Sequence, residues 1–190
     1  MESASAENRQ RRGSIWLMPI IVGTLILGSD QWTKWLIRQK LDAESAIDVI
    51  RGFVQLVLVE NPGAAFGLFS DHDSSYRQMF LIVLSVLALA VLGWLLRGLR
   101  REDVLARFTV GLLGGGAYGN LIDRVAFGRV TDFVRIYYKT WEWPSFNVAD
   151  SAITIGIILL LTDSMIFAPR RQRLRASATA AAERTTGNAS

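Results

Sequence analysis

Three aspartates, Asp123, Asp132 and Asp150, lie where two strongly apolar segments of the chain end and begin. A carboxylate beside a membrane-spanning segment is costly to keep there, so several on one side indicate a functional site. When two carboxyl groups share a site, one stays protonated and one ionised near neutral pH. The ionised group can activate a water for attack on a peptide carbonyl. Its protonated partner can bind the carbonyl oxygen and later supply a proton to the leaving amine.

Each acid also has a simpler structural explanation. Asn147 with Asp150 three positions later resembles a capping box at the start of a helix, and Asp132 has the sequence context of a solvated loop acid. Either explanation suffices for one acid alone. We favour a shared site because, as the charge distribution indicates, both acids belong to the same membrane face.

Other catalytic classes fit the sequence less well. The chain has no cysteine, which excludes disulfides, thiol nucleophiles and thiolate metal sites. Its single histidine, His72, excludes patterns such as H-E-x-x-H, and we expect no metal or other cofactor. Ser29 and Lys34 do not share a helix face well at their spacing, which argues against a serine–lysine protease.

The apolar residues predict a mainly α membrane protein with four transmembrane helices. The chain has 190 residues, 51% of them hydrophobic, bunched into runs too long for globular helices. A span needs about 20 mostly apolar residues, and we predict spans at 15–37, 76–99, 104–122 and 148–168. The third is the least apolar. Charged residues near the end of the first favour a retained helix over a cleaved signal peptide.

The basic residues, which give a net charge of +4, are explained by topology and do not require a nucleic-acid partner. Arginines precede the first span, flank the connection between spans two and three, and follow the last span. Under the positive-inside rule, both termini are then cytoplasmic. The ends of spans one and three and the start of span four meet at the outer face. Polar residues distant in sequence are thereby expected at one depth.

The segments outside the spans differ in character. Residues 1–13 and 176–190 are predicted to be disordered. With 170–190 as a basic, then low-complexity tail, residues 14–169 remain as one membrane domain. Between spans one and two, residues 47–69 favour strand with a turn at Asn61-Pro62-Gly63, so we expect a small outward β-element. Residues 130–146 are amphipathic and rich in aromatics that anchor at the headgroup level.

Several polar and small residues permit two interpretations. Asp30 and Lys34, one helical turn apart, favour an ion pair over a direct chemical role. Asn61 suits a turn, or a contact to an extended peptide.

Two further groups lie in the third span. Glycines at every fourth position, Gly111, Gly115 and Gly119, favour close helix packing. Asp123 and Arg124 can pair with each other, or Arg124 can join Asn120 in binding a substrate backbone or a headgroup; both remain open.

Five ordered sequence blocks resemble the signature motifs of bacterial lipoprotein signal peptidase, signal peptidase II. They are DQWTK (30–34), ENPGAAFG (60–67), GGAYGNLIDR (115–124), TDF (131–133) and FNVADS (146–151). The resemblance covers about 15–168. It implies an aspartic endopeptidase of the bacterial inner membrane, with its site at the outer face. Such an enzyme removes signal peptides from diacylglyceryl-modified prolipoproteins, cutting before the lipidated cysteine. Membrane lipids and the family's cyclic peptide inhibitors are the other expected partners.

The resemblance also assigns roles by motif. Asp132 and Asp150 match the catalytic pair. The substrate-binding or supporting set is Asn61, Gly63, Asn120, Asp123, Arg124 and Asn147, and the structural or orienting set is Asp30, Lys34, Gly115 and Gly119. Pro62 and Thr131 depart slightly from the usual motifs. The family further suggests a β-cradle before the second span and a movable outer amphipathic helix after Asp132.

Two rival functions remain at this point. Intramembrane acids also build ion paths, so the chain could be a small carrier with Asp30, Asp123 and Asp150 along a pathway. Clustering at one face opposes this, because only Asp163 lies deeper or toward the far side. A third possibility is a membrane scaffold whose acids merely pair. Prolipoprotein cleavage, as opposed to ion flux, would distinguish the enzyme from the carrier.

Overall fold

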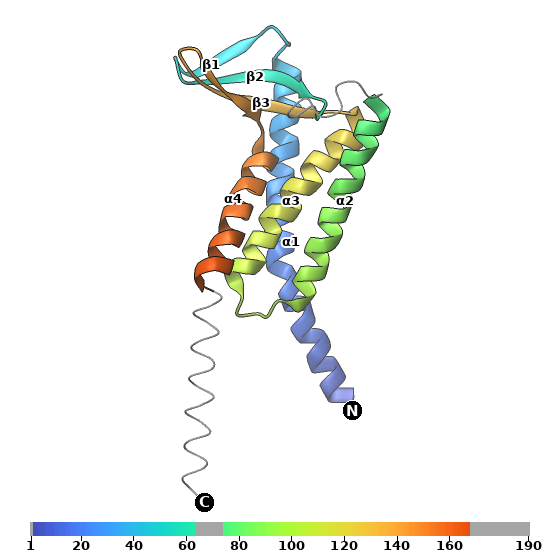
Figure 1. The fold of residues 1–190 in the computed structure, drawn as a ribbon. Helices are drawn as coiled ribbons and strands as arrows, with labels where there is room; N and C mark the ends of the chain where they lie inside the picture. Colours follow the sequence, from blue (N-terminus) through green and yellow to red (C-terminus); the bar gives the residue numbers. More distant parts are fainter. Residues whose placement is uncertain (1, 64–73, 168–190) are drawn as a thin grey trace, which may run out of the picture.

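A helical bundle with a small sheet across one end makes up the protein (Figure 1). The computed structural model describes residues 2–63 and 74–167. The helices are α1 (Glu2–Lys40), α2 (Ser74–Gly98), α3 (Val104–Phe127) and α4 (Val148–Thr162), the last continued by the π-helical turn η2 (Asp163–Phe167). α3 packs against each of the other three helices. The residues on α3 are therefore placed to contact groups from the whole bundle.

Three of the four predicted spans meet the length and hydropathy expected of a membrane-crossing helix. These are Ile15–Lys40, Ser75–Gly98 and Val148–Met165, and among the described residues α3 does not join them. α3 carries the run GGGAYGN and a long series of buried residues. Because its neighbours cover it, α3 depends less on an apolar surface of its own.

Glycines let α3 approach its neighbours at backbone distance. A Cβ atom built on Gly115 would lie 2.7 Å from the carbonyl oxygen of Gly23 in α1, and one on Gly116 would lie 2.6 Å from that of Ala149 in α4. A Cβ on Gly119 would meet the Asp30 carboxylate at 2.6 Å. Any side chain at these positions would push α1 or α4 away and widen the polar site between them.

The sheet is antiparallel with strand order β1-β2-β3-β4. Its strands are β1 (Ala46–Ile50), β2 (Val54–Asn61), β3 (Val130–Tyr138) and β4 (Trp141–Phe146). The predicted β-element between the first two spans is thus present as β1 and β2, although residues 64–69 of it lie outside the described residues. β2 pairs with β3 so that Val59 faces Asp132 and Asn61 faces Val130. This register brings Asn61 beside Asp132.

The predicted outer amphipathic helix after Asp132 is wrong. Residues 130–146 form the β3–β4 hairpin, which turns near Lys139 at a positive φ of 54°. The run VTDFVRIYY is rich in β-branched and aromatic residues, which favour strands. The strand β2 provides the pairing partner that such a segment needs.

The ends of the chain differ from the expected boundaries. α1 begins at Glu2, so its first turns occupy the segment for which the sequence predicts disorder. The predicted low-complexity tail and the single histidine, His72, lie outside the described residues.

Candidate active site

Asp132 and Asp150 line one cavity beneath the sheet. Asp132 lies on β3 and is 2% exposed, and Asp150 lies in the first turn of α4. The cavity has a volume of about 480 Å³ and is also lined by Asn61 and by residues 143–146 of β4. We call it the aspartate cavity. It gives two carboxylates access to one space, as hydrolysis by paired acids requires.

Two side-chain amides hold the Asp132 carboxylate. Asn147 donates from Nδ2 to Oδ1 at 2.7 Å, and Asn61 donates from Nδ2 to Oδ2 at 2.9 Å. Burial raises the pKa of Asp132 to about 6; the bonds from the two asparagines lower it, and the nearby Asp150 charge raises it further. Asp132 therefore takes up a proton as the pH falls toward 6.

The Asp150 carboxylate accepts two hydrogen bonds. Asn120 donates from Nδ2 to Oδ1 at 2.8 Å, and the backbone N–H of Asn147 donates to Oδ2 at 3.2 Å. Asp150 N–H in turn donates to the Asn147 side chain, which completes the predicted capping box of α4. The partial positive charge of a helix N-terminus adds to these interactions.

Each asparagine beside the two acids has its orientation fixed by a donor at its carbonyl oxygen. Gly63 N–H donates to Asn61 Oδ1 at 2.8 Å, Asp150 N–H to Asn147 Oδ1 at 2.9 Å, and Lys34 Nζ to Asn120 Oδ1 at 3.0 Å. Neither an amide N–H nor an ammonium can accept a hydrogen bond, so the oxygens must face these groups. The amide NH₂ groups are left to face Asp132 and Asp150.

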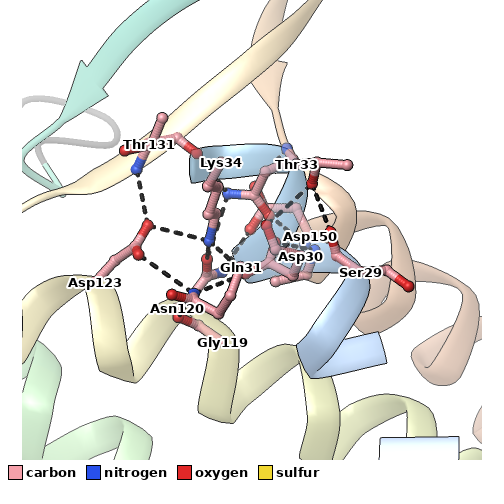
Figure 2. Close-up of polar contacts among 12 residues, drawn as sticks. Ser29, Asp30, Gln31, Thr33, Lys34, Gly119, Asn120, Asp123, Thr131 and Asp150 are labelled. Carbon is pink, nitrogen blue, oxygen red and sulfur yellow. Dashed lines mark hydrogen bonds and ion pairs between the residues drawn. The ribbon is translucent and has the colours of Figure 1, made fainter. Parts of the chain in front are cut away.

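A cluster of buried charges lies next to Asp150 (Figure 2). Lys34 pairs with Asp30 at 2.7 Å and with Asp123 at 3.1 Å, and all three side chains are fully buried. Arg38 Nη2 contacts Asp123 at 3.0 Å. The ion pair predicted between Asp30 and Lys34 is therefore present.

Asp123 does not take Arg124 as its partner. Its carboxylate is held by Lys34 and Arg38 from α1 and by Gln31 Nε2 at 3.3 Å. Arg124 instead donates from Nη1 to the backbone oxygen of Asn120 at 3.3 Å. The expected Asp123–Arg124 pair is thus replaced by contacts between helices. Adjacent residues on a helix point in different directions, which frees Arg124 for another role.

Arg124 lines a second cavity, of about 530 Å³, between α2, α3 and α4. Its walls are mostly leucine, valine, isoleucine and alanine, and its polar residues include Asn120, Arg124 and Asp150. Asp150 thus borders both this apolar cavity and the aspartate cavity. A molecule with an apolar part and a scissile polar bond could contact the two cavities at once. Across residues 2–63 and 74–167, no group of three or more His, Asp or Glu side chains is arranged to hold a metal ion.

Comparison with known proteins identifies the family. The sequence model of the family Signal peptidase (SPase) II matches residues 22–166. The chain belongs to the signal peptidase II family. It is 46% identical to the lipoprotein signal peptidase of Geobacter sulfurreducens over 80% of this chain and 92% of the relative. It is 44% identical to that of Syntrophotalea carbinolica over 75% and 87%, respectively.

Solved structures agree with this membership of the signal peptidase II family. A bacterial membrane enzyme determined by the in meso method at 1.9 Å resolution superposes with a TM-score of 0.69. It is 29% identical and covers 79% of this chain and 94% of its own. The three apolar helices and the similarity to this membrane enzyme indicate that the protein is itself a membrane enzyme.

Three contributors to this signal peptidase II site were missed by sequence reasoning. Gln31 and Arg38 contact Asp123 from α1, and Thr131 donates its backbone N–H to Asp123 while its hydroxyl oxygen accepts from Arg38 Nε. Arg38 lies one turn after Lys34, so the helical spacing of Lys34 and Arg38 could have placed both on one polar face. Nothing in the sequence indicates the contacts of Gln31 and Thr131.

Proposed function

We propose that this protein removes the signal peptide from diacylglyceryl-modified prolipoproteins, with Asp132 and Asp150 as its catalytic pair. Its family is one of aspartic peptidases that act on prolipoproteins. The observation that carries the assignment of the pair is their shared cavity, with an oriented asparagine amide directed at each carboxylate. A carrier or a scaffold gives no reason for two acids held in this way.

The surroundings of the two acids support different roles for them. Asp150, held in place by Asn120 and the start of α4, acts as the base that takes a proton from water. Asp132, whose raised pKa of about 6 lets it carry a proton as the pH falls toward 6, binds the carbonyl oxygen of the scissile bond in its protonated form. The water oxygen bonds to the carbonyl carbon, and the C–N bond breaks as Asp132 protonates the leaving amine. The proton on Asp150 then returns to Asp132, which resets the pair.

The apolar cavity supports a place for the apolar part of the substrate. Its apolar walls suit acyl chains or the signal peptide, and Asp150 at its border would place the scissile bond beside the pair. Arg124 in the same wall would bind the substrate backbone or an ester oxygen. The family's cyclic peptide inhibitors would compete for this region.

The same proposal includes the orientation in the membrane. α3, enclosed by α1, α2 and α4, would act as the fourth span. Arg100 and Arg101 in the connection between α2 and α3, at the end of the bundle away from the sheet, support cytoplasmic termini, in the bacterial inner membrane (Figure 1). The sheet and the two acids would then lie at the outer face, where a lipidated substrate meets water.

Cleavage by purified full-length protein tests this function. We expect a synthetic diacylglyceryl prolipopeptide to be cleaved before its lipidated cysteine. Asp132→Asn or Asp150→Asn should lower kcat by at least about 10³-fold, because each removes one half of a cooperating pair. Asp48→Asn, at an exposed position on β1, is the matched control and should retain full activity. Full turnover in either site variant would refute the pair, and ion flux without cleavage would favour a carrier.

A further inference from the structure

Lys34 uses all of its hydrogen-bonding capacity inside the protein. Its ammonium group, fully buried, contacts Asp30 Oδ2 at 2.7 Å, Asp123 Oδ2 at 3.1 Å and Asn120 Oδ1 at 3.0 Å (Figure 2). An ammonium has three N–H donors, so these acceptors saturate it. The side chain therefore ties together α1 and two positions of α3 at one point.

Two of these acceptors extend the contact to the residues next to the catalytic pair. Asp30 Oδ1 accepts from the backbone N–H of Ala149 at 2.9 Å, and Ala149 immediately precedes Asp150. Asp123 Oδ2 accepts from the backbone N–H of Thr131 at 3.1 Å, and Thr131 immediately precedes Asp132. Each catalytic acid thus follows a peptide N–H that is anchored by a buried carboxylate paired with Lys34.

The third acceptor is Asn120 Oδ1, and its bond from Lys34 fixes the orientation of the Asn120 side-chain amide. With its oxygen on Lys34, Asn120 can only present its NH₂ group to Asp150 Oδ1, at 2.8 Å. A reversed amide would place an oxygen against the carboxylate and an NH₂ against the ammonium, and both contacts would be repulsive. Lys34 therefore acts on Asp150 along two routes, through Asn120 and through Asp30.

We infer that Lys34 is a positioning residue that sets the relative placement of Asp132 and Asp150 through Asp30, Asp123 and Asn120. The inference rests on the proposed function, because it assumes that these two aspartates are the catalytic pair. It goes beyond an ion pair that offsets the cost of burial, since charge compensation alone does not need three particular acceptors. Arg38 contacts only the Asp123 side of this arrangement in the part of the chain that the structure describes.

The catalytic consequence follows from geometry. A displacement of reacting groups by about 1 Å can lower a rate by about 10²-fold without weakening substrate binding. Loss of Lys34 would release both anchoring carboxylates and the Asn120 amide together. We therefore expect the loss in kcat, with KM little changed.

The experiment uses a double substitution that keeps the buried charge balanced. Asp30→Asn with Lys34→Met removes one anion and one cation, and the new amide oxygen at position 30 can still accept from Ala149 N–H. Asp123 keeps Arg38 as its partner. In the purified full chain we expect kcat for prolipopeptide cleavage to fall by about 10²-fold at unchanged KM. The control, Arg135→Met with Glu142→Gln, removes a partly exposed pair on the β3–β4 hairpin and should keep wild-type kcat.

A second variant separates charge from positioning. Lys34→Arg keeps the buried cation, but a planar guanidinium cannot place its donors where the tetrahedral ammonium does. We expect kcat to fall at least about tenfold with the melting temperature retained.

Wild-type kcat in a folded Asp30→Asn, Lys34→Met protein, or a loss confined to KM, would overturn the inference. If that protein does not fold, Lys34→Arg decides, and wild-type kcat there would show that charge suffices. Failure of the proposed function is distinguished from these results by full turnover in Asp132→Asn or Asp150→Asn.

Discussion

Asn147 donates its side-chain amide to Asp132 at 2.7 Å while the same side chain accepts the N–H of Asp150 at 2.9 Å. One residue thus joins β3 to the start of α4 and fixes both acids relative to each other. Because an N-cap must lie directly before its helix, the position of Asp150 follows from that of the cap. The capping box that the sequence offers as an alternative to catalysis is therefore part of the same arrangement.

Replacing Asn147 should separate its capping role from its contact with Asp132. Asn147→Ser keeps an oxygen that can accept from Asp150 N–H, since serine caps helices about as well as asparagine. It lacks the amide that donates to Asp132. We expect a melting temperature near that of the wild type and a kcat lower by about 10- to 100-fold, because Asp132 loses a hydrogen bond that holds it in its catalytic position. Steady-state kinetics and thermal denaturation measure the two effects.

Asn147→Ala is the comparison variant. It loses the cap as well, so it should be destabilised further, by about 1 kcal/mol, with a similar loss in kcat. A serine variant with wild-type kcat would show that Asp132 does not depend on the Asn147 amide.

Gly63 should matter because it orients Asn61. It adopts a positive φ of 82°, and a Cβ atom there would clash with the Leu81 side chain. Gly63→Ala would therefore displace the N–H that fixes the Asn61 amide toward Asp132. We expect kcat to fall about tenfold or more, because the Asp132 carboxyl group is no longer held in its catalytic position. Gly52→Ala is the matched control, with a φ of 76° and open space around it. It should share the backbone strain, about 1 kcal/mol, without the loss in kcat; equal kcat in the two variants would contradict the role of Gly63.

The sequence predicts which residues gather at the site better than it predicts which side chains pair with each other there. Topology alone places Asp30, Lys34, Asn120 and Asp123 at one depth, because the spans alternate in direction, and in the structure these side chains touch. It does not specify their pairing. Adjacency in the sequence leaves Arg124 open as a partner for Asp123, whereas the observed partners come from α1. Contacts between helices depend on their rotation and separation, which glycines such as Gly115 set through packing.

The hairpin at 130–146 shows a second limit of sequence reasoning. Its aromatic residues suit a membrane interface in either a helix or a strand, so composition does not decide between them. The deciding interaction is the pairing of β3 with β2, whose partners lie between 69 positions (Asn61 with Val130) and 82 positions (Val54 with Ile136) apart in the sequence. No local sequence pattern identifies β2 as the partner of β3.

The pH dependence of cleavage should reveal which acid is protonated. Burial raises the pKa of Asp132 to about 6. If Asp132 must be protonated to bind the carbonyl oxygen and protonate the amine, kcat/KM should fall as the pH rises through about 6. A kcat/KM that instead rises with pH there would assign Asp132 as the base.

Asn61→Ala removes a hydrogen bond that lowers the pKa of Asp132, so the descending limb of the pH profile should move to higher pH. Gln55→Ala, on the same strand but hydrogen-bonded to Asp48, should leave the limb in place. An Asn61→Ala profile that moves to lower pH, or not at all, would mean that the limb does not report Asp132.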